Sequence, residues 1–139
     1  MDIWTKKKRS EVMSNIRSKN TKPEIKLRKA LFAEGYRYLL HDKKLPGKPD
    51  IVLTKYKTAI FVHGCFWHYH KNCPEGRIPK SNIVFWKNKL LNNVKRDLKH
   101  QRELKRSGWN VIVIWECELE DKKTIKNKVL QLKSILKSK

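Results

Sequence analysis

A stretch of thirteen residues, 61–73, constrains the fold of this chain more than any other part. It contains three of the five histidines and two of the three cysteines, together with the adjacent aromatics Phe66 and Trp67. The loop expected over residues 63–80 has little apolar content, so packing alone would stabilise it weakly. A bound metal ion can stabilise such a loop, because its binding free energy is then also folding free energy.

Three helices are predicted from capping signals and from apolar residues at helical spacing. They span residues 21–33, 83–106 and 122–136. Thr21 and Glu24 form a capping box, in which each side chain bonds a free backbone N–H of the first turn. The long second helix is expected to bury an apolar stripe. That stripe consists of Trp86, Leu90, Val94 and Leu98.

Four strands are predicted from short apolar and β-branched runs. They are residues 36–40, 50–53, 58–62 and 109–115. A polar turn should join the second and third strands in a hairpin, and the strongly β-prone fourth strand is expected at the centre of the sheet. The element order predicts an α/β fold, with a central mixed β-sheet flanked by helices. Residues 1–20 are interpreted as a DNA-contacting arm, and residues 21–139 as one domain.

The charge of the chain points to a polyanionic partner. Its 34 lysines and arginines outnumber 13 acidic residues, which gives a formal net charge of +21. The basic residues are spread over the whole chain, which favours duplex DNA or RNA over a membrane surface. No apolar run reaches the roughly 20 residues that span a bilayer, and the N-terminus lacks the apolar centre of a signal peptide. We therefore expect a cytoplasmic protein without a membrane partner, located at the nucleoid when it is bound to DNA.

The cysteines indicate a structural zinc site. Three cysteines cannot all pair within the chain, and a reducing compartment favours metal binding over disulfides. If the strand before Cys117 neighbours the strand that ends at Val62, then Cys65, His70, Cys73 and Cys117 can form a closed tetrahedral Zn²⁺ site. On spacing alone, His68 is an alternative to His70.

A second group of residues indicates metal-dependent catalysis. Asp50 begins an apolar strand, where a carboxylate is costly to bury unless a cation meets it. The hairpin should bring Val62 and His63 beside Asp50, so the main-chain carbonyl of Val62 can bind the same Mg²⁺. Either His63 or His68 can act as a general base or acid at neutral pH. Together with the charge, this pattern predicts a metal-dependent enzyme that cuts nucleic acid.

Two acids have an alternative, purely structural interpretation. Asp97 can orient one of the histidines, or it can be a solvated acid among the basic residues of its helix. Glu24 can contribute to the site, although its capping role already explains it.

Several apolar side chains are candidates for contact with bases. Phe66 and Trp67 are expected in a polar loop beside a basic surface, where they can stack on bases or wedge between base pairs. Trp86 can join them or pack in the core, and Met13 of the basic arm can insert into a groove or pack on a helix. Trp109 and Trp115 are interpreted as core residues.

Five segments of the chain resemble one known family, the very short patch repair (Vsr) endonucleases. They are Leu45-Pro46-Gly47-Lys48-Pro49-Asp50, Phe61-Val62-His63-Gly64-Cys65-Phe66-Trp67-His68, Phe85-Trp86, Asn93-Val94-Lys95-Arg96-Asp97 and Trp115-Glu116-Cys117. They occur in order and at matching spacing between about Arg9 and Leu119. The resemblance implies a restriction-endonuclease-like fold and Mg²⁺-dependent nicking of one DNA strand, 5′ to the thymine of a T:G mismatch. Such mismatches arise when 5-methylcytosine deaminates, so it also implies work alongside a cytosine-5 methyltransferase and host repair proteins.

The resemblance also implies a role for individual residues. The catalytic group falls on Asp50, His63, His68, Asp97 and Glu24, with Mg²⁺ held by Asp50 and the main-chain carbonyl of Val62. The zinc ligands fall on Cys65, His70, Cys73 and Cys117, and the DNA-contacting apolar residues fall on Met13, Phe66, Trp67 and Trp86. We expect a monomer, since an enzyme that nicks one strand has no need to dimerise. The alternatives are a restriction-type nuclease of broader specificity and a zinc-stapled DNA-binding module without catalysis.

Overall fold

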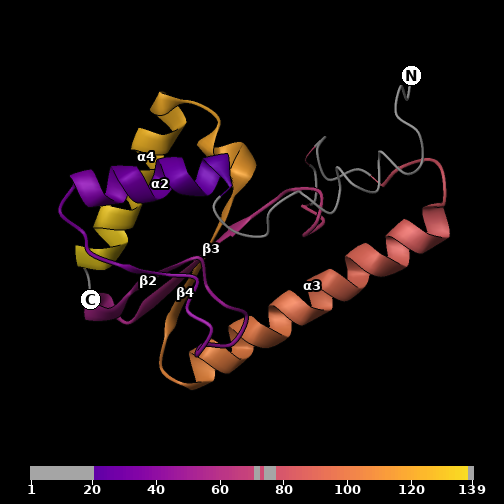
Figure 1. The fold of residues 1–139 in the computed structure, drawn as a ribbon, viewed down its shortest axis with the longest axis horizontal. Helices are drawn as coiled ribbons and strands as arrows, with labels where there is room; N and C mark the ends of the chain where they lie inside the picture. The colour runs from indigo at the N-terminus through magenta and orange to yellow at the C-terminus, as the bar shows by residue number, and fades with distance from the viewer. Residues whose placement is uncertain (1–20, 71–72, 74–77, 138–139) are drawn as a thin grey trace.

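The computed structural model describes residues 21–70, 73 and 78–137. Within this part, three α-helices, four β-strands and two short 3₁₀ segments follow one another along the chain (Figure 1). In chain order they are α2 (Lys22–Ala33), β1 (Leu39–Leu40), β2 (Ile51–Leu53), η1 (Thr54–Tyr56), β3 (Thr58–His63), α3 (Ile83–Arg106), β4 (Asn110–Trp115), η3 (Glu116–Leu119) and α4 (Lys122–Lys137). The predicted arm 1–20, with Met13, lies outside the described residues.

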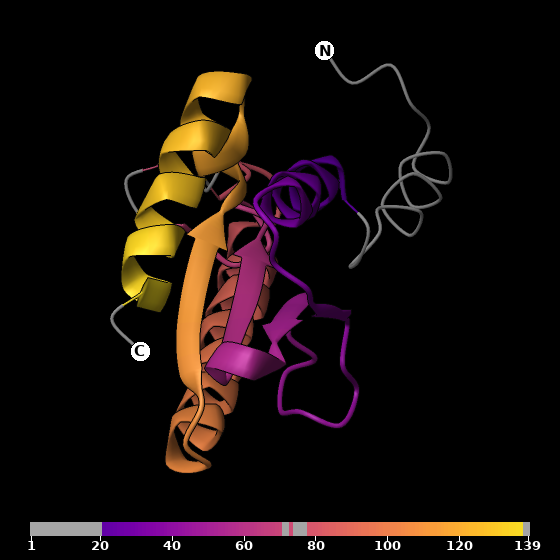
Figure 2. The same ribbon diagram turned by 90° about the vertical axis from the view of Figure 1, so that its left-hand side faces the viewer.

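The four strands form one mixed sheet in the order β1-β2-β3-β4. The β1–β2 and β2–β3 pairs are antiparallel, which confirms the predicted hairpin, whereas β3 and β4 run parallel (Figure 2). The parallel register pairs Thr58 with Asn110 and His63 with Trp115, so both strands end at the same edge of the sheet.

The prediction of a central position for the strand at residues 109–115 is wrong. Among the described strands, β4 lies at the edge of the sheet and pairs only with β3. Its side chains pack on both faces, because Ile114 belongs to one apolar core while Val111 and Val113 pack against the other. The continuous apolar run therefore reflects two faces covered by helices, not two neighbouring strands.

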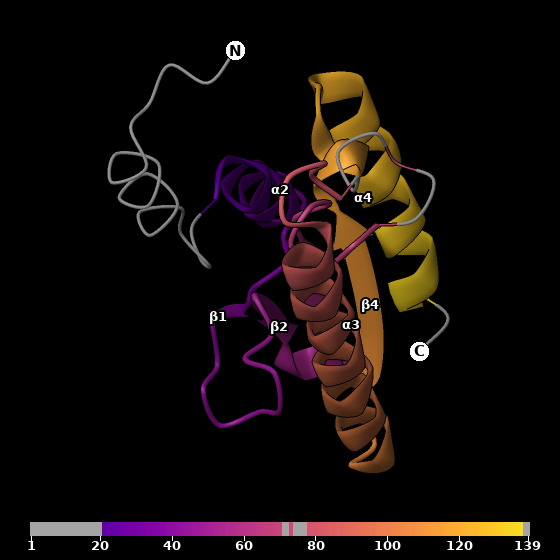
Figure 3. The same cartoon turned by 90° about the vertical axis from the view of Figure 1, so that its right-hand side faces the viewer.

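Helices cover the two faces of the sheet separately. Figure 1 shows the strands between the α2–α4 pair and α3, and Figure 3 shows α3 lying along β4. Side chains alternate between the faces along each strand, so Ile60 packs toward α2 and α4 while its neighbours Ala59 and Phe61 pack toward Leu104 of α3. The larger core gathers the apolar faces of α2, α4 and the sheet. Its buried members are Leu27, Leu31, Ile51, Leu53, Ile60, Ile114, Leu119, Ile125, Val129, Leu132 and Leu136.

The first predicted strand is shorter than expected. Only Leu39 and Leu40 pair with β2, which is itself three residues long. Tyr36 and Tyr38 pack against the larger core instead, and the Tyr38 hydroxyl donates to the main-chain oxygen of Arg28 at 3.0 Å. Tyr38 thus ties this segment to α2, and its ring also meets Phe32 of that helix edge-on.

The apolar stripe of α3 also differs from the prediction. Leu90 and Leu104 are fully buried, Trp86 is half-buried, and Leu98 is 51% exposed. Residues at a constant spacing of four drift by about 40° per step around a helix of 3.6 residues per turn, so Leu98 lies about 120° away from Trp86. Helix α3 therefore buries a different face, which includes Asp97 on its half-buried border.

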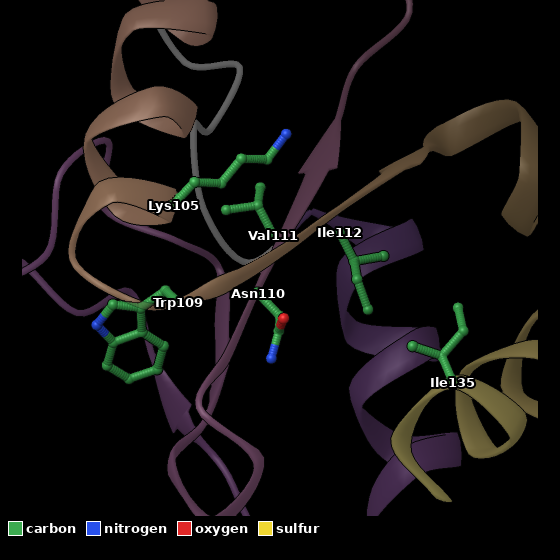
Figure 4. Close-up of a pocket in the computed structure, with 6 residues that line it drawn as sticks. All are labelled: Lys105, Trp109, Asn110, Val111, Ile112 and Ile135. Carbon is green, nitrogen blue, oxygen red and sulfur yellow. The ribbon is translucent and has the colours of Figure 1, made fainter. Parts of the chain in front are cut away.

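The exposed edge of β4 borders a shallow hollow of about 380 Å³. Its lining residues come from the end of α3, the first half of β4 and α4 (Figure 4). They are Lys105, Trp109, Asn110, Val111, Ile112 and Ile135. None of them belongs to the predicted site, whose residues follow the opposite ends of β3 and β4. No described helix is long and apolar enough to cross a membrane.

Candidate active site and metal centre

The carboxyl ends of β3 and β4 gather most of the predicted site. His63 ends β3, and Trp115 ends β4 two residues before Cys117. Since β2 runs antiparallel to β3, the residue before β2 also lies at this edge, and that residue is Asp50. The sequence folds this way because a tight hairpin joins β2 to β3, whereas the long helix α3 returns the chain for a parallel strand.

Asp50 is buried beside the end of β3. Its side chain is bonded by the backbone N–H of Val62, which donates to Oδ2 at 2.7 Å. Burial raises the pKa of Asp50 to about 7; the Val62 N–H opposes the rise, and the nearby Glu24 carboxyl reinforces it. A carboxylate held in such a place is stabilised by a cation.

Glu24 faces the same place from α2 and is 1% exposed. Its Oε2 accepts a hydrogen bond from Arg28 at 3.0 Å and lies 2.8 Å from Nε2 of His41. Thr21 caps the helix by accepting from the Glu24 N–H at 3.4 Å, as predicted. The Glu24 carboxylate, however, is directed at the site, which corrects the reciprocal capping that the sequence indicated.

His41 is a site residue that the sequence analysis missed. The donor atoms of Glu24, His41 and Asp50 all lie within 4.8 Å of one another. The strand register contains the signal, because Leu40 pairs with Ile51 and so the next residue, His41, comes opposite Asp50. The three residues form a carboxylate–imidazole cluster that is suited to a divalent cation.

A second cluster consists of His63, His68 and Asp97, whose donor atoms also lie within 4.8 Å of one another. The two imidazole rings stack at 3.8 Å between centroids, nearly parallel at 4°. Nδ1 of His68 lies 2.5 Å from Oδ2 of Asp97. This contact favours the alternative in which Asp97 orients a histidine, because an ionised carboxylate keeps the proton on Nδ1 and leaves Nε2 free to accept one.

His63 is the buried member of this pair and is 5% exposed. Burial is the main cause that lowers its pKa to about 4; the neighbouring His68 acts in the same direction, and Asp97 opposes the shift. The ring is therefore neutral at physiological pH. Its Nδ1 is buried without a hydrogen-bond partner within the described part of the chain, so it can interact with a bound group.

Cys65, His70, Cys73 and Cys117 form a third cluster, again with all donor atoms within 4.8 Å of one another. The structure thus brings His70, not His68, together with the three cysteines. Sγ of Cys117 lies 3.6 Å from Nδ1 of His70, which matches the separation of about 3.6 Å for sulfur and nitrogen ligands on one tetrahedral Zn²⁺. Burial raises the pKa of the Cys65 thiol to about 12 and also that of Cys117, with neighbouring thiols adding to the rise. A zinc ion would reverse both shifts, since it binds the thiolate form.

Trp115 lies between His70 of the cysteine–histidine cluster and the pair His63 and His68, so its interpretation as a simple core residue is corrected. Its ring stacks on His70 at 4.1 Å and 6°, and it meets the ring of His63 edge-on at 5.2 Å. The next residue, Glu116, accepts a hydrogen bond from the N–H of Cys65 at 3.2 Å. The end of β4 therefore positions both neighbouring clusters at once.

The predicted DNA-contacting aromatics form a single group. Phe66 lies 5.0 Å from Trp67 and 5.5 Å from Trp86, measured between ring centroids, and all three are half-buried. Asn93 of α3 donates to the main-chain oxygen of Trp67 at 2.9 Å and so fastens the loop to the helix. Beside them, Phe85 is 58% exposed. Trp86 therefore belongs with the loop aromatics rather than with the sheet core.

The mixed sheet, with acid and imidazole clusters at one edge on a strongly basic chain, defines a nuclease-type site. A family model described as DNA mismatch endonuclease Vsr matches residues 1–75. The type II nicking enzyme V.NmeAIP of Neisseria meningitidis serogroup A is 53% identical over 131 residues, which cover 94% of this chain and 93% of that protein.

Two further relatives agree with this match. The type II nicking enzyme V.XorIIP of Xanthomonas oryzae pv. oryzae is 45% identical, over 86% of this chain and 88% of its own length. The DNA mismatch endonuclease Vsr of Escherichia coli K12 is 36% identical, over 93% of this chain and 82% of its own length. The chain belongs to the Vsr family of DNA mismatch endonucleases. It is thus a DNA endonuclease, as the sequence indicated.

Proposed function

We propose that this enzyme nicks one strand of duplex DNA, 5′ to the thymine of a T:G mismatch, in a reaction that depends on Mg²⁺. Membership of the Vsr family supports the reaction class. The observation that carries the proposal is the presence of two clusters at one sheet edge, Asp50 with Glu24 and His63 with His68 and Asp97. A DNA-binding module without catalysis has no need for either cluster.

Asp50 and the main-chain carbonyl of Val62 are the residues that would hold the magnesium ion, with Glu24 beside them. When bound, Mg²⁺ polarises the scissile phosphate and stabilises the developing negative charge. The buried Asp50 carboxyl fits such a charge, because burial and the neighbouring Glu24 carboxyl raise its pKa, and a bound cation would offset that cost of ionisation.

The histidines supply the proton transfers. His68 accepts the proton of the attacking water at Nε2, while Asp97 holds its other nitrogen and stabilises the imidazolium that forms. His63 is neutral, buried and stacked on His68. It donates a hydrogen bond to the phosphate or to the leaving oxygen.

The aromatic group of Phe66, Trp67 and Trp86 recognises the mismatch by wedging into the base stack. A mismatched step is cheaper to unstack than a paired one, so the wedge discriminates by the cost of deforming the DNA. Met13 would contribute from the N-terminal arm. The large positive charge adds affinity for any duplex.

A zinc ion on Cys65, His70, Cys73 and Cys117 would be structural, since four protein ligands leave no open position. The fold that we infer is restriction-endonuclease-like. The enzyme would act as a cytoplasmic, nucleoid-bound monomer, beside a cytosine-5 methyltransferase whose deaminated product creates the T:G substrate, and together with host repair proteins.

The direct test is cleavage of a labelled duplex with one T:G mismatch against a matched T:A duplex, with Mg²⁺ and with chelator. We expect Mg²⁺-dependent nicking of the mismatched duplex alone. Equal cutting of both duplexes would favour a restriction-type nuclease of broader specificity. Tight binding without any cutting, in several flanking contexts, would favour a zinc-stapled binding module.

A further inference from the structure

We propose that His41 is a direct ligand of the divalent cation at the Asp50 site, which gives the site a nitrogen donor that Mn²⁺ accepts more readily than Mg²⁺ does. The proposal rests on the proposed metal-dependent function and deepens it. It assigns a role to a residue outside the group formed by Asp50, the Val62 carbonyl and Glu24.

The donor atoms have the spacing that one ion requires. In an octahedral site with ligands at about 2.1 Å, adjacent donors lie about 3.0 Å apart and opposite donors about 4.2 Å apart. Nε2 of His41 lies 2.8 Å from Oε2 of Glu24, and the donor atoms of Glu24, His41 and Asp50 are all within 4.8 Å of one another. Three donor atoms this close together can be brought onto one cation by small movements of their side chains.

The main chain holds His41 in this position. Its N–H donates to the main-chain oxygen of Asp50 at 3.1 Å, so the two residues are tied together across the hairpin. The backbone of His41 is left-handed, with φ at 48°, a conformation that non-glycine residues rarely adopt. The imidazole itself is only 16% exposed.

A role for His41 that is limited to holding the Glu24 carboxylate does not account for this arrangement. Arg28 already donates to the same carboxylate oxygen of Glu24 at 3.0 Å and carries a full positive charge. The His41 imidazole adds little to that ion pair, but it adds a nitrogen donor to two carboxylates. First-row transition ions gain far more from an imidazole ligand than Mg²⁺ does, because Mg²⁺ prefers oxygen donors.

The test uses the full-length, zinc-loaded protein with Mn²⁺ as the probe. Pulsed electron paramagnetic resonance detects the coupling of a directly bound ¹⁴N nucleus to Mn²⁺. We expect this coupling in the native protein and in His63→Gln and His68→Gln, and its loss in His41→Gln. His41→Asn serves as the second variant if His41→Gln does not fold, as judged by circular dichroism.

A titration provides the second readout. His41→Gln should weaken Mn²⁺ binding about tenfold but Mg²⁺ binding by less than about threefold, because Mn²⁺ accepts an imidazole ligand more readily than Mg²⁺ does. Three results would overturn the proposal. They are absence of the ¹⁴N coupling in the native protein, its persistence in the His41 variants, and an equal loss of affinity for Mn²⁺ and Mg²⁺ in His41→Gln. Normal Mg²⁺-dependent nicking without ¹⁴N coupling refutes only the role of His41, whereas coupling without nicking refutes the proposed function.

Discussion

At the scale of single residues, Asp50 shows how a residue of the site can lower the stability of the folded protein. The folded protein holds this carboxyl in a buried place beside Glu24, which raises its pKa from 3.8 to about 7. The folded state therefore keeps a proton that the unfolded chain releases. The same destabilised carboxylate is what a divalent cation would bind most strongly.

Replacement of Asp50 by Asn should separate these two effects. The contribution of Asp50 to stability is fully present below about pH 4 and is lost as the pH rises to 7 and above, because the folded pKa is raised. A shift of about three units sets a ceiling of about 4 kcal/mol on the loss. Without added divalent metal, the melting temperature of Asp50→Asn should exceed that of the native protein at pH 8. The difference in melting temperature should be smaller at pH 5.

The same variant should lose nicking and should gain no stability from Mg²⁺, which should raise the melting temperature of the native protein. Equal melting temperatures of the two proteins at pH 8 would show that the buried carboxylate is not destabilising. Retained nicking would remove Asp50 from the catalytic site.

Asp97→Asn tests whether Asp97 orients His68. An amide cannot stabilise the imidazolium, and it can favour the wrong tautomer, so the single-turnover nicking rate should fall about 10²-fold. Melting temperature and zinc content should stay unchanged, because Asp97 is half-buried on the border of α3. A rate within threefold of the native one would assign Asp97 to the solvated helix surface.

At the scale of elements, the sequence predicts what depends on local signals. The helices at residues 22–33, 83–106 and 122–137 begin and end within one residue of their predictions, because caps, glycines and helical spacing mark them. The position of β4 at the sheet edge and the place of His41 beside Asp50 were not predictable in this way. Both depend on which strands pair and in what register, and local patterns do not specify this.

The segment that leads into Asp50 depends on a glycine at residue 47. Gly47 has a φ of +77°, and a Cβ there would lie 2.9 Å from Cβ of His100 on α3. Gly47→Ala should therefore displace this segment, lower the free energy of unfolding by about 1–3 kcal/mol and reduce nicking.

Gly35→Ala is the matched control for this variant. Gly35 also has a positive φ, +96°, but a Cβ there would meet no atom within 4 Å. Gly35→Ala should therefore lower the free energy of unfolding by about 1 kcal/mol through backbone strain alone, and its nicking rate should be normal. Equal nicking by the two variants would show that the contact with His100 does not position Asp50.

At the scale of the whole molecule, one cysteine–histidine cluster joins parts that are distant in sequence. Cys65 and His70 follow β3, whereas Cys117 follows β4, and Trp115 stacks on His70 beside His63 and His68. A zinc ion there would fasten the loop to the sheet edge. Stability and catalysis would then depend on the same ion, although it takes no part in the chemistry.

Cys117→Ser should lower the zinc content and the melting temperature together. Structural zinc sites contribute several kcal/mol of folding free energy, so the loss should exceed that of an ordinary surface substitution. Elemental analysis and thermal melting measure the two effects, and chelator-treated native protein provides the comparison. Unchanged zinc content and melting would mean that the cluster is not a closed zinc site.

The central claim is that this sheet edge makes a strand-specific cut at a mismatch. The most direct measurement uses one T:G duplex with a different fluorophore on each strand, in Mg²⁺, with the products resolved to single nucleotides. We predict one product, from the thymine-containing strand, cut immediately 5′ to the mismatched thymine. Cutting of the guanine-containing strand at a comparable rate, or cutting away from the mismatch, would contradict it.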